Sequence, residues 1–160
     1  MSASQQVELL CVLAYSVMAI HISFYDTQNK LVRNRDLAIG LGAVGILTAA
    51  RSILLQDWGP VFGAAIGAVA MFVVFWIISA LGRNQLGSGD VGLASFLGLF
   101  LGNWGVPPLI IGWAVPFALA AIPSAIVWWR HGKESYIPFG PFVVLSAPVT
   151  LLITVPGLIR

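Results

Sequence analysis

The sequence predicts an all-α, polytopic integral membrane protein with six transmembrane helices in a single domain spanning residues 1–160. Three observations predict this class. Hydrophobic residues make up 59% of the chain and charged residues only 9%, whereas soluble domains carry about 25% charged residues. Mean hydropathy is +0.94. Apolar runs recur along the chain, most of them near the length of about 20 residues that crosses the hydrocarbon core of a bilayer.

The same composition excludes several classes of protein. A surface this poor in charge excludes a soluble globular enzyme, and high hydrophobicity excludes intrinsic disorder. A net charge of +2 supplies no basic face for nucleic acid. The single cysteine, Cys11, excludes a disulfide scaffold, and His21 and His131 lie far apart in the sequence. We therefore expect no metal site and no cofactor.

Each apolar run is bounded by a short polar connection. The expected spans are about Val7–Tyr25, Leu37–Leu55, Pro60–Leu81, Val91–Leu101, Val106–Trp129 and Pro141–Ile159. The first is expected to remain as a helix, because no basic segment precedes it as in a cleaved signal peptide. The fourth is short for a full span. Pro116 and Pro123 are expected to kink the fifth.

The distribution of lysine and arginine orients this bundle. The connections after the first, third and fifth spans carry six of the eight basic residues, namely Lys30, Arg33, Arg35, Arg83, Arg130 and Lys133, whereas the other side has Arg51 and Arg160. Loops rich in lysine and arginine stay in the cytoplasm. The sequence therefore predicts a cytoplasmic (inner) membrane protein with both termini outside and Asp26 and Asp90 on the cytoplasmic side.

Small residues recur in three of the spans, and in the third and fourth spans they are four residues apart. They are Gly40, Gly42 and Gly45, then Gly63 and Gly67, then Ala94, Gly98 and Gly102. Such ladders let helix backbones approach closely in lipid. This favours internal packing over a docking groove for a substrate helix. Gly98→Ala is expected to be a milder change than Gly89→Val, because alanine is still small.

Two of the six acidic residues stand out as candidates for chemistry. Asp90 follows Gly87-Ser88-Gly89 directly before an apolar helix; it can cap that helix, but capping does not require two glycines. Bare glycine backbone lets an extended peptide come close. Asp26 ends the first span, where a carboxylate meets the unfavourable negative end of the helix. The alternative is a solvated acid paired with Lys30 or Arg33, which is worth little.

The remaining polar residues have structural interpretations. Asp36 or Asn34 caps the second span, Asp57 and Glu134 are solvated loop acids, His21 makes a helix–helix contact in preference to transferring protons, and Cys11 is a packing residue. Two aspartates at one membrane face, by contrast, are typical of aspartic-protease chemistry. One ionised carboxylate takes a proton from water while the other, protonated, polarises the scissile carbonyl.

Three ordered motifs resemble those of the type IV prepilin peptidases. Gly87-Ser-Gly-Asp90 and the glycine-spaced helix after it resemble the Gly-x-Gly-Asp motif. Asp26 to Asn34 resembles the motif in which an aspartate is followed by basic residues and Ile-Pro-Asn. Ile137-Pro-Phe-Gly-Pro-Phe142 resembles the Pro-Phe-Gly-Pro segment that opens the last helix. The resemblance covers nearly the whole chain.

The resemblance implies a membrane aspartic endopeptidase that removes the leader of pilin-like precursors at the cytoplasmic membrane face. Its partners are then prepilin-like substrates and the lipid bilayer, and the sequence assigns no oligomeric state. Carried over residue by residue, Asp26 and Asp90 are the catalytic pair. The residues expected to shape the substrate site are Gly87, Gly89, Asn34, Pro138, Phe139, Gly140 and Pro141.

The chain departs from the family pattern at two places. Gly92 replaces the usual lysine after the second aspartate, and Val32-Arg33 replaces Ile-Pro before the asparagine. With one cysteine and no preceding cytoplasmic region, it resembles the short, peptidase-only members. Two alternatives stay open: a catalytically inactive relative that handles pilins, and a small transporter or channel subunit in which the two aspartates line a polar path.

Overall fold

The computed structural model describes residues 3–29, 32–81, 87–131 and 139–154. These residues form α1 (Ala3–Asn29), α2 (Asn34–Leu55), α3 (Gly59–Leu81), α4 (Ser88–Gly102), α5 (Val106–His131) and α6 (Gly140–Thr154). No strand occurs within these ranges, which confirms the all-α membrane class. The helices α1, α2, α3 and α5 are long and apolar enough to cross a membrane, and α4 and α6 are shorter apolar helices.

The helix boundaries differ from the expected spans mainly at the ends. Helix α1 continues beyond Tyr25 to Asn29, so Asp26 lies in its last turn rather than in a loop. Helix α5 continues without interruption through Pro116 and Pro123. Helix α6 ends at Thr154, and the rest of the expected sixth span, to residue 159, lies outside the described residues.

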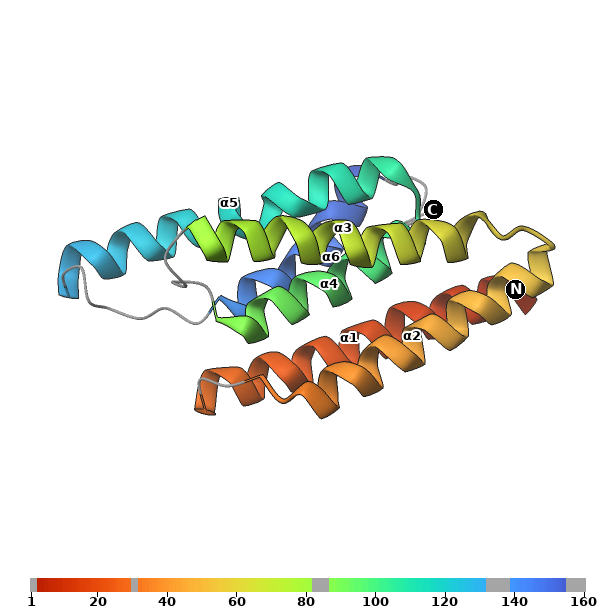
Figure 1. Ribbon diagram of the computed structural model, residues 1–160, viewed down its shortest axis with the longest axis horizontal. Coiled ribbons are helices and arrows are strands. Elements are labelled where there is room, and N and C mark those ends of the chain that lie inside the picture. Colours follow the sequence, from red (N-terminus) through yellow and green to blue (C-terminus); the bar gives the residue numbers. More distant parts are fainter. Residues whose placement is uncertain (1–2, 30–31, 82–86, 132–138, 155–160) are drawn as a thin grey trace.

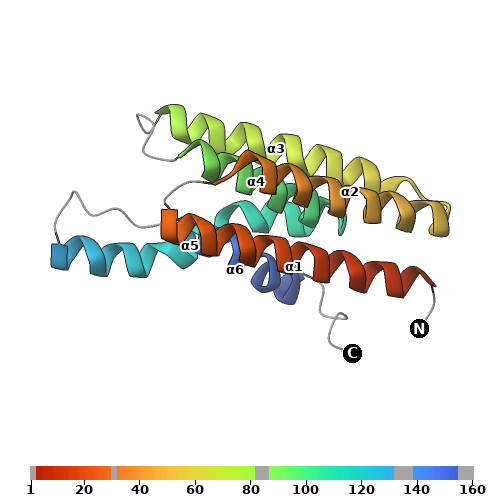
Figure 2. The ribbon, with the colours of Figure 1, turned by 90° about the horizontal axis from the view of Figure 1, so that it is seen from below.

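Helix α4 is the centre of the bundle. It contacts α2, α3, α5 and α6, and eleven of its 15 residues are buried. Figures 1 and 2 show α3 and α4 running side by side, with α1 and α2 packed as a second pair. The outward surfaces are apolar, with Val17, Ile46 and Phe62 each more than 60% exposed. Such faces are stable when they contact lipid.

Glycines bring α3 and α4 into backbone contact. A Cβ atom built on Gly63 would meet the carbonyl oxygen of Gly102, and one on Gly67 would meet that of Gly98. The packing interpretation of these ladders is therefore confirmed. It is wrong for Gly42 and Gly45, which have nothing within 4 Å of such an atom.

Aromatic side chains hold α1 against the same central helix. The ring of Tyr15 on α1 stacks on Phe100 with centroids 4.1 Å apart and tilts against Phe96 at 4.9 Å. All three side chains are at most 3% exposed. Aromatic pairs of this kind contribute about 0.5–1.5 kcal/mol beyond the burial of their area. They therefore keep α1 in register with α4.

Alanine at Gly98 should destabilise the bundle, contrary to the expectation from its size. Its Cβ would overlap the carbonyl oxygen of Gly67 and approach the Cγ atom of Met71 within 2.6 Å. Overpacking of this kind costs about 1–3 kcal/mol. We expect Gly98→Ala to lower the thermal unfolding temperature of the purified protein. Gly42→Ala is the matched control and should not lower that temperature, because nothing lies within 4 Å of its added methyl group and alanine favours a helix over glycine. Equal losses in both variants would contradict the packing.

Candidate active site

The carboxyl group of Asp26 is buried inside the bundle. The residue is 3% exposed, so its interpretation as a solvated loop acid is wrong. It lies one turn before the end of α1, and its side chain reaches the first residue of α6, Gly140. A Cβ atom built on Gly140 would lie 2.8 Å from Oδ2 of Asp26. Glycine is therefore required here by the close approach of the carboxylate.

This contact changes the electrostatics expected for Asp26. The carboxylate interacts with the backbone N–H of Gly140 at the positive end of α6, which stabilises negative charge. The negative end of α1 disfavours the charge on Asp26, whereas the positive end of α6 favours it. Oδ2 itself is buried and has no hydrogen-bond partner among the described residues.

Phe139 positions the start of α6. Its ring packs against Phe117 at 5.2 Å and Phe75 at 6.2 Å between centroids, and its carbonyl oxygen accepts the first backbone hydrogen bonds of α6. The aromatic cluster therefore holds Gly140 against Asp26. Pro138 lies outside the described residues.

Asp90 occupies the first turn of α4. Its Oδ2 accepts a hydrogen bond from the backbone N–H of Gly87 at 3.2 Å, as an acidic residue does at the third position of a capped helix. The residue is 6% exposed. Capping is therefore one of its roles, and burial sets it apart from an ordinary surface cap.

The two carboxyl groups interact electrostatically. Burial, and then the negative charge of Asp26, raise the pKa of Asp90 to about 6, although the hydrogen bond from Gly87 opposes this shift. Two acids that share a site do not ionise together easily, and they titrate as a pair. The end of α1, which carries Asp26, lies at the same end of the bundle as the starts of α4 and α6 (Figures 1 and 2).

The site is arranged for general acid–base chemistry. A buried acceptor without a partner costs about 1–3 kcal/mol, so Oδ2 of Asp26 favours a bound proton or water. Asp90, with its raised pKa, holds a proton to higher pH than an exposed aspartate does. No group of three or more histidine, cysteine or acidic side chains able to hold a metal occurs among the described residues.

The backbone of Gly89 is not accessible to a substrate peptide. A Cβ atom at this position would lie 2.6 Å from Cβ and 2.7 Å from Cγ2 of Val32, in the connection between α1 and α2. The space beside Gly89 is thus filled by the chain itself, which corrects its interpretation as a docking surface. Gly87 is different, because it is exposed and the nearest atom to such a Cβ is 3.6 Å away, on Asp90.

Both departures from the family pattern have structural explanations. Gly92 faces Leu37 on α2, whose Cδ2 atom occupies the place of a side chain. Arg33 precedes α2 with φ −78° and ψ 120°, within the range that proline adopts. Its guanidinium lies over the ring of Tyr25 at 5.5 Å. The backbone at Arg33 is therefore compatible with the proline of the family motif.

The other sequence candidates lie around this site or away from it. Asn34 is exposed at the first position of α2, where Arg33 is the cap residue and no side-chain cap is present. Asp36 instead pairs with His21 at 3.6 Å between Oδ2 and Nε2, which confirms the helix–helix contact predicted for His21. Asp57 lies elsewhere, accepting a hydrogen bond from the N–H of Gly59.

A side cavity of about 400 Å³ adjoins the second aspartate loop. Gly87, Ser88 and Val91 form one wall, and Phe72, Trp76, Ser79 and Ala80 of α3 form the other. Phe72 and Trp76 are 46% and 58% exposed on the lipid-facing surface. The sequence did not predict this cavity, because neither helix sequence alone indicates that α3 pairs with α4.

Comparison with known proteins agrees with this geometry. Residues 13–127 match the type IV leader peptidase family, a range that includes both aspartates. The chain belongs to the type IV leader peptidase family. It is 30% identical over 141 residues to a prepilin leader peptidase/N-methyltransferase from Dichelobacter nodosus, covering 88% of this chain and 47% of the relative.

Two further relatives carry the same description. The one from Xanthomonas campestris pv. campestris is 26% identical over 134 residues, which cover 82% of this chain and 45% of the relative. The one from Aeromonas salmonicida is 27% identical over 148 residues, covering 89% and 49%. The chain thus spans about half the length of the curated relatives it matches. No solved structure gives a significant match.

The contact between Gly89 and Val32 predicts a compensating pair of mutations. Gly89→Ala should reduce folded protein in the membrane, because its methyl group overlaps Val32. Overpacking costs about 1–3 kcal/mol. Val32→Gly removes the overlapping atoms, so the double variant should recover part of the loss, as a double-mutant cycle of thermal unfolding would measure. Strictly additive losses would show that the two residues do not share this space.

Proposed function

We propose that this protein is a membrane aspartic endopeptidase that cleaves the leader peptide of type IV pilin-like precursors at the cytoplasmic membrane face. The observation that carries this proposal is the burial of Asp26 and Asp90 together at one end of the bundle. Family membership supports the substrate class. The excess of lysine and arginine in the connections at that end supports the cytoplasmic orientation.

The two aspartates take different roles in this mechanism. Asp26 is the base, because its buried Oδ2 has no partner among the residues that the structure describes and can accept a proton from the attacking water. Asp90 is the acid, because its raised pKa lets it carry a proton to higher pH than an exposed aspartate does, and in that protonated form it can polarise the scissile carbonyl. The water oxygen attacks that carbonyl, and the protons pass to the leaving amine as the carbon–nitrogen bond breaks.

The side cavity supports a lateral path for the substrate. An apolar segment of the precursor stays in lipid against Phe72 and Trp76, while the stretch to be cut unwinds beside the exposed backbone of Gly87. A peptide bond inside a helix is shielded by its own hydrogen bonds, so the unwound backbone needs new partners. The peptide bond then reaches Asp90 without first leaving the membrane.

The position of the acids disfavours a transporter. Carboxylates that line a transport path lie near the midplane of the bilayer, whereas Asp26 and Asp90 lie together at one end of the bundle. An inactive relative that only handles pilins would have the same architecture, and the mutations below distinguish it.

Asp26→Asn and Asp90→Asn, made separately, should each abolish cleavage of a co-expressed prepilin. Asparagine preserves the shape of the side chain but cannot exchange the proton that activates water. The loss should be at least about a hundredfold, as for removal of a positioned general acid or base. The measurement is the fraction of shortened pilin at equal abundance of each variant in the membrane.

Asp36→Asn is the matched control. It alters an aspartate of the neighbouring helix that pairs with His21 and should retain most of the cleavage activity. Full activity of Asp26→Asn would overturn the assignment of the dyad. No cleavage by the unmodified protein, for any prepilin tested, would favour the inactive relative.

The cleavage rate should fall as the pH rises above about 6. Asp90 carries its proton below its pKa of about 6 and loses it above that value, after which both carboxyl groups are ionised and no acid remains. The rate should then decrease about tenfold per pH unit well above the apparent pKa. A rate that stays constant from pH 6 to 8 in detergent solution, with the protein still folded, would contradict this role.

A further inference from the structure

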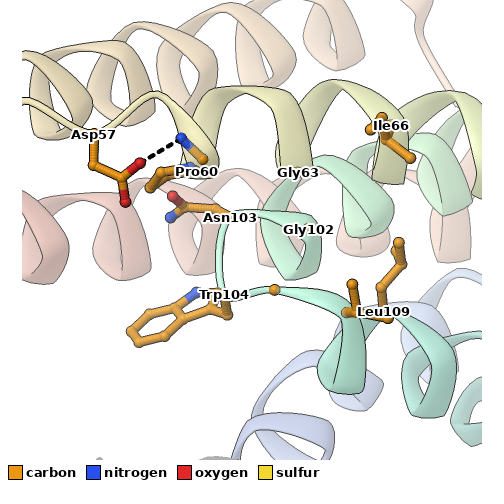
Figure 3. Close-up of a pocket in the computed structure, with 11 residues that line it drawn as sticks. Asp57, Pro60, Gly63, Ile66, Gly102, Asn103, Trp104 and Leu109 are labelled. Atoms are coloured by element: carbon orange, nitrogen blue, oxygen red, sulfur yellow. Dashed lines mark hydrogen bonds between the residues drawn. The ribbon is translucent and has the colours of Figure 1, made fainter.

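A second polar site lies at the end of the bundle opposite the aspartates. A cavity of about 350 Å³ opens between the start of α3 and the connection from α4 to α5 (Figure 3). Most of its lining is apolar, from Pro60, Gly63, Ile66, Val106 and Leu109, and its polar members are Asp57, Asn103 and Trp104. None of these residues takes part in the proposed chemistry.

The cavity is lined by a buried amide group whose hydrogen bonds are only half satisfied among the described residues. Asn103 is 4% exposed, and its Oδ1 accepts a hydrogen bond of 3.1 Å from Nη1 of Arg51. An arginine donates only, so this contact fixes which end of the amide is oxygen. The remaining Nδ2 has no hydrogen-bond partner in the part of the chain that the structure describes. A buried donor left in this way costs about 1–3 kcal/mol, so an acceptor placed here is strongly favoured.

Two neighbouring groups add to this unused donor capacity. The indole Nε1 of Trp104 and the Nε of Arg51 are buried, and neither has a partner within residues 3–29, 32–81, 87–131 and 139–154. The guanidinium of Arg51 lies over the indole ring at 5.6 Å. Figure 3 shows the indole nitrogen turned toward Asn103. All three groups are N–H donors. Together they suit a ligand rich in acceptor oxygens, such as a phosphate diester.

The charges around the cavity restrict the ligand further. Arg51 is partly neutralised by Glu8, 3.8 Å away, and Asp57 forms no ion pair among the described residues. A ligand with only negative charge would be repelled by Asp57. A ligand that places a primary ammonium group beside this carboxylate and a phosphate beside the donors satisfies both.

The surroundings indicate a lipid rather than a soluble ligand. Ile66 and Val106 are 63% and 64% exposed at the cavity, and such apolar surface is stable beside acyl chains. Trp58, next to the cavity, is 54% exposed, and tryptophans of this kind lie at the level of lipid headgroups. The ligand should therefore have a polar head and an apolar body.

We propose that this cavity binds the headgroup of a phospholipid that carries a primary ammonium group, as in phosphatidylethanolamine. The phosphate oxygens accept hydrogen bonds from Asn103 and Trp104, the ammonium group lies beside Asp57, and the acyl chains leave past Ile66. The site fixes the connection between α4 and α5 at the membrane surface. This proposal does not depend on the peptidase function.

The test is the thermal unfolding of the full chain, purified and delipidated in detergent, with added lipid. Phosphatidylethanolamine at about 100 times its dissociation constant should raise the unfolding temperature by about 5–10 °C. Phosphatidylcholine, which lacks N–H donors, and phosphatidylglycerol, which lacks the cation, should raise it less. Equal shifts from all three lipids would overturn the proposal in favour of a general bilayer effect.

Inorganic phosphate is the last ligand whose effect on the unfolding temperature is compared. It should produce no shift, because it lacks both the ammonium group and the apolar body. A shift equal to that of phosphatidylethanolamine would overturn the lipid assignment and indicate a simple anion site.

Two conservative variants locate the site. Trp104→Phe removes the indole N–H but keeps an aromatic ring, and Asn103→Asp keeps the acceptor for Arg51 but replaces the free donor with an oxygen. Each should abolish most of the shift. Trp58→Phe, at the exposed neighbour, should keep all of it. A full shift in both Trp104→Phe and Asn103→Asp would show that the lipid binds elsewhere.

Discussion

The architecture depends on keeping two carboxyl groups together inside an apolar bundle. Burial disfavours ionisation, and a second negative charge nearby disfavours it further. The fold opposes these costs with backbone dipoles: the start of α4 holds Asp90 through the Gly87 N–H, and the start of α6 faces Asp26. The part of this cost that is not offset raises the pKa of Asp90 to about 6, so Asp90 retains its proton to about that pH. That retained proton is what the proposed hydrolysis requires.

This arrangement needs α4 in the middle of the molecule. A helix surrounded on all sides must be apolar or small almost everywhere, and α4 has no basic residue and one acidic residue, Asp90. Its glycines allow α3 to approach to backbone contact, so α4 is held along its length. The aromatic cluster around Phe139 holds the third element of the site in the same way. Rigid packing therefore positions both carboxyl groups.

Much of this was predictable from the sequence, and the remainder has a common physical cause. Hydropathy located every helix, and polar residues at the ends of apolar runs indicated Asp26 and Asp90. Hydropathy does not say which helix faces which. The presence of several glycines in one span therefore predicted packing correctly for Gly67 and wrongly for Gly42, and nothing in the sequence indicated that Val32 fills the space beside Gly89.

The short length of α4 determines where water must go. Gly98 lies opposite Gly67 and Gly102 opposite Gly63, so the two helices run antiparallel and Asp90 is level with the region of Phe75. Helix α3 continues to Leu81, about 9 Å further at 1.5 Å per residue. Asp90 is therefore recessed below the rim formed by the end of α3. Water, a reactant in any hydrolysis at this site, has to descend past that rim, so the depth of the recess governs hydration of the carboxyl pair.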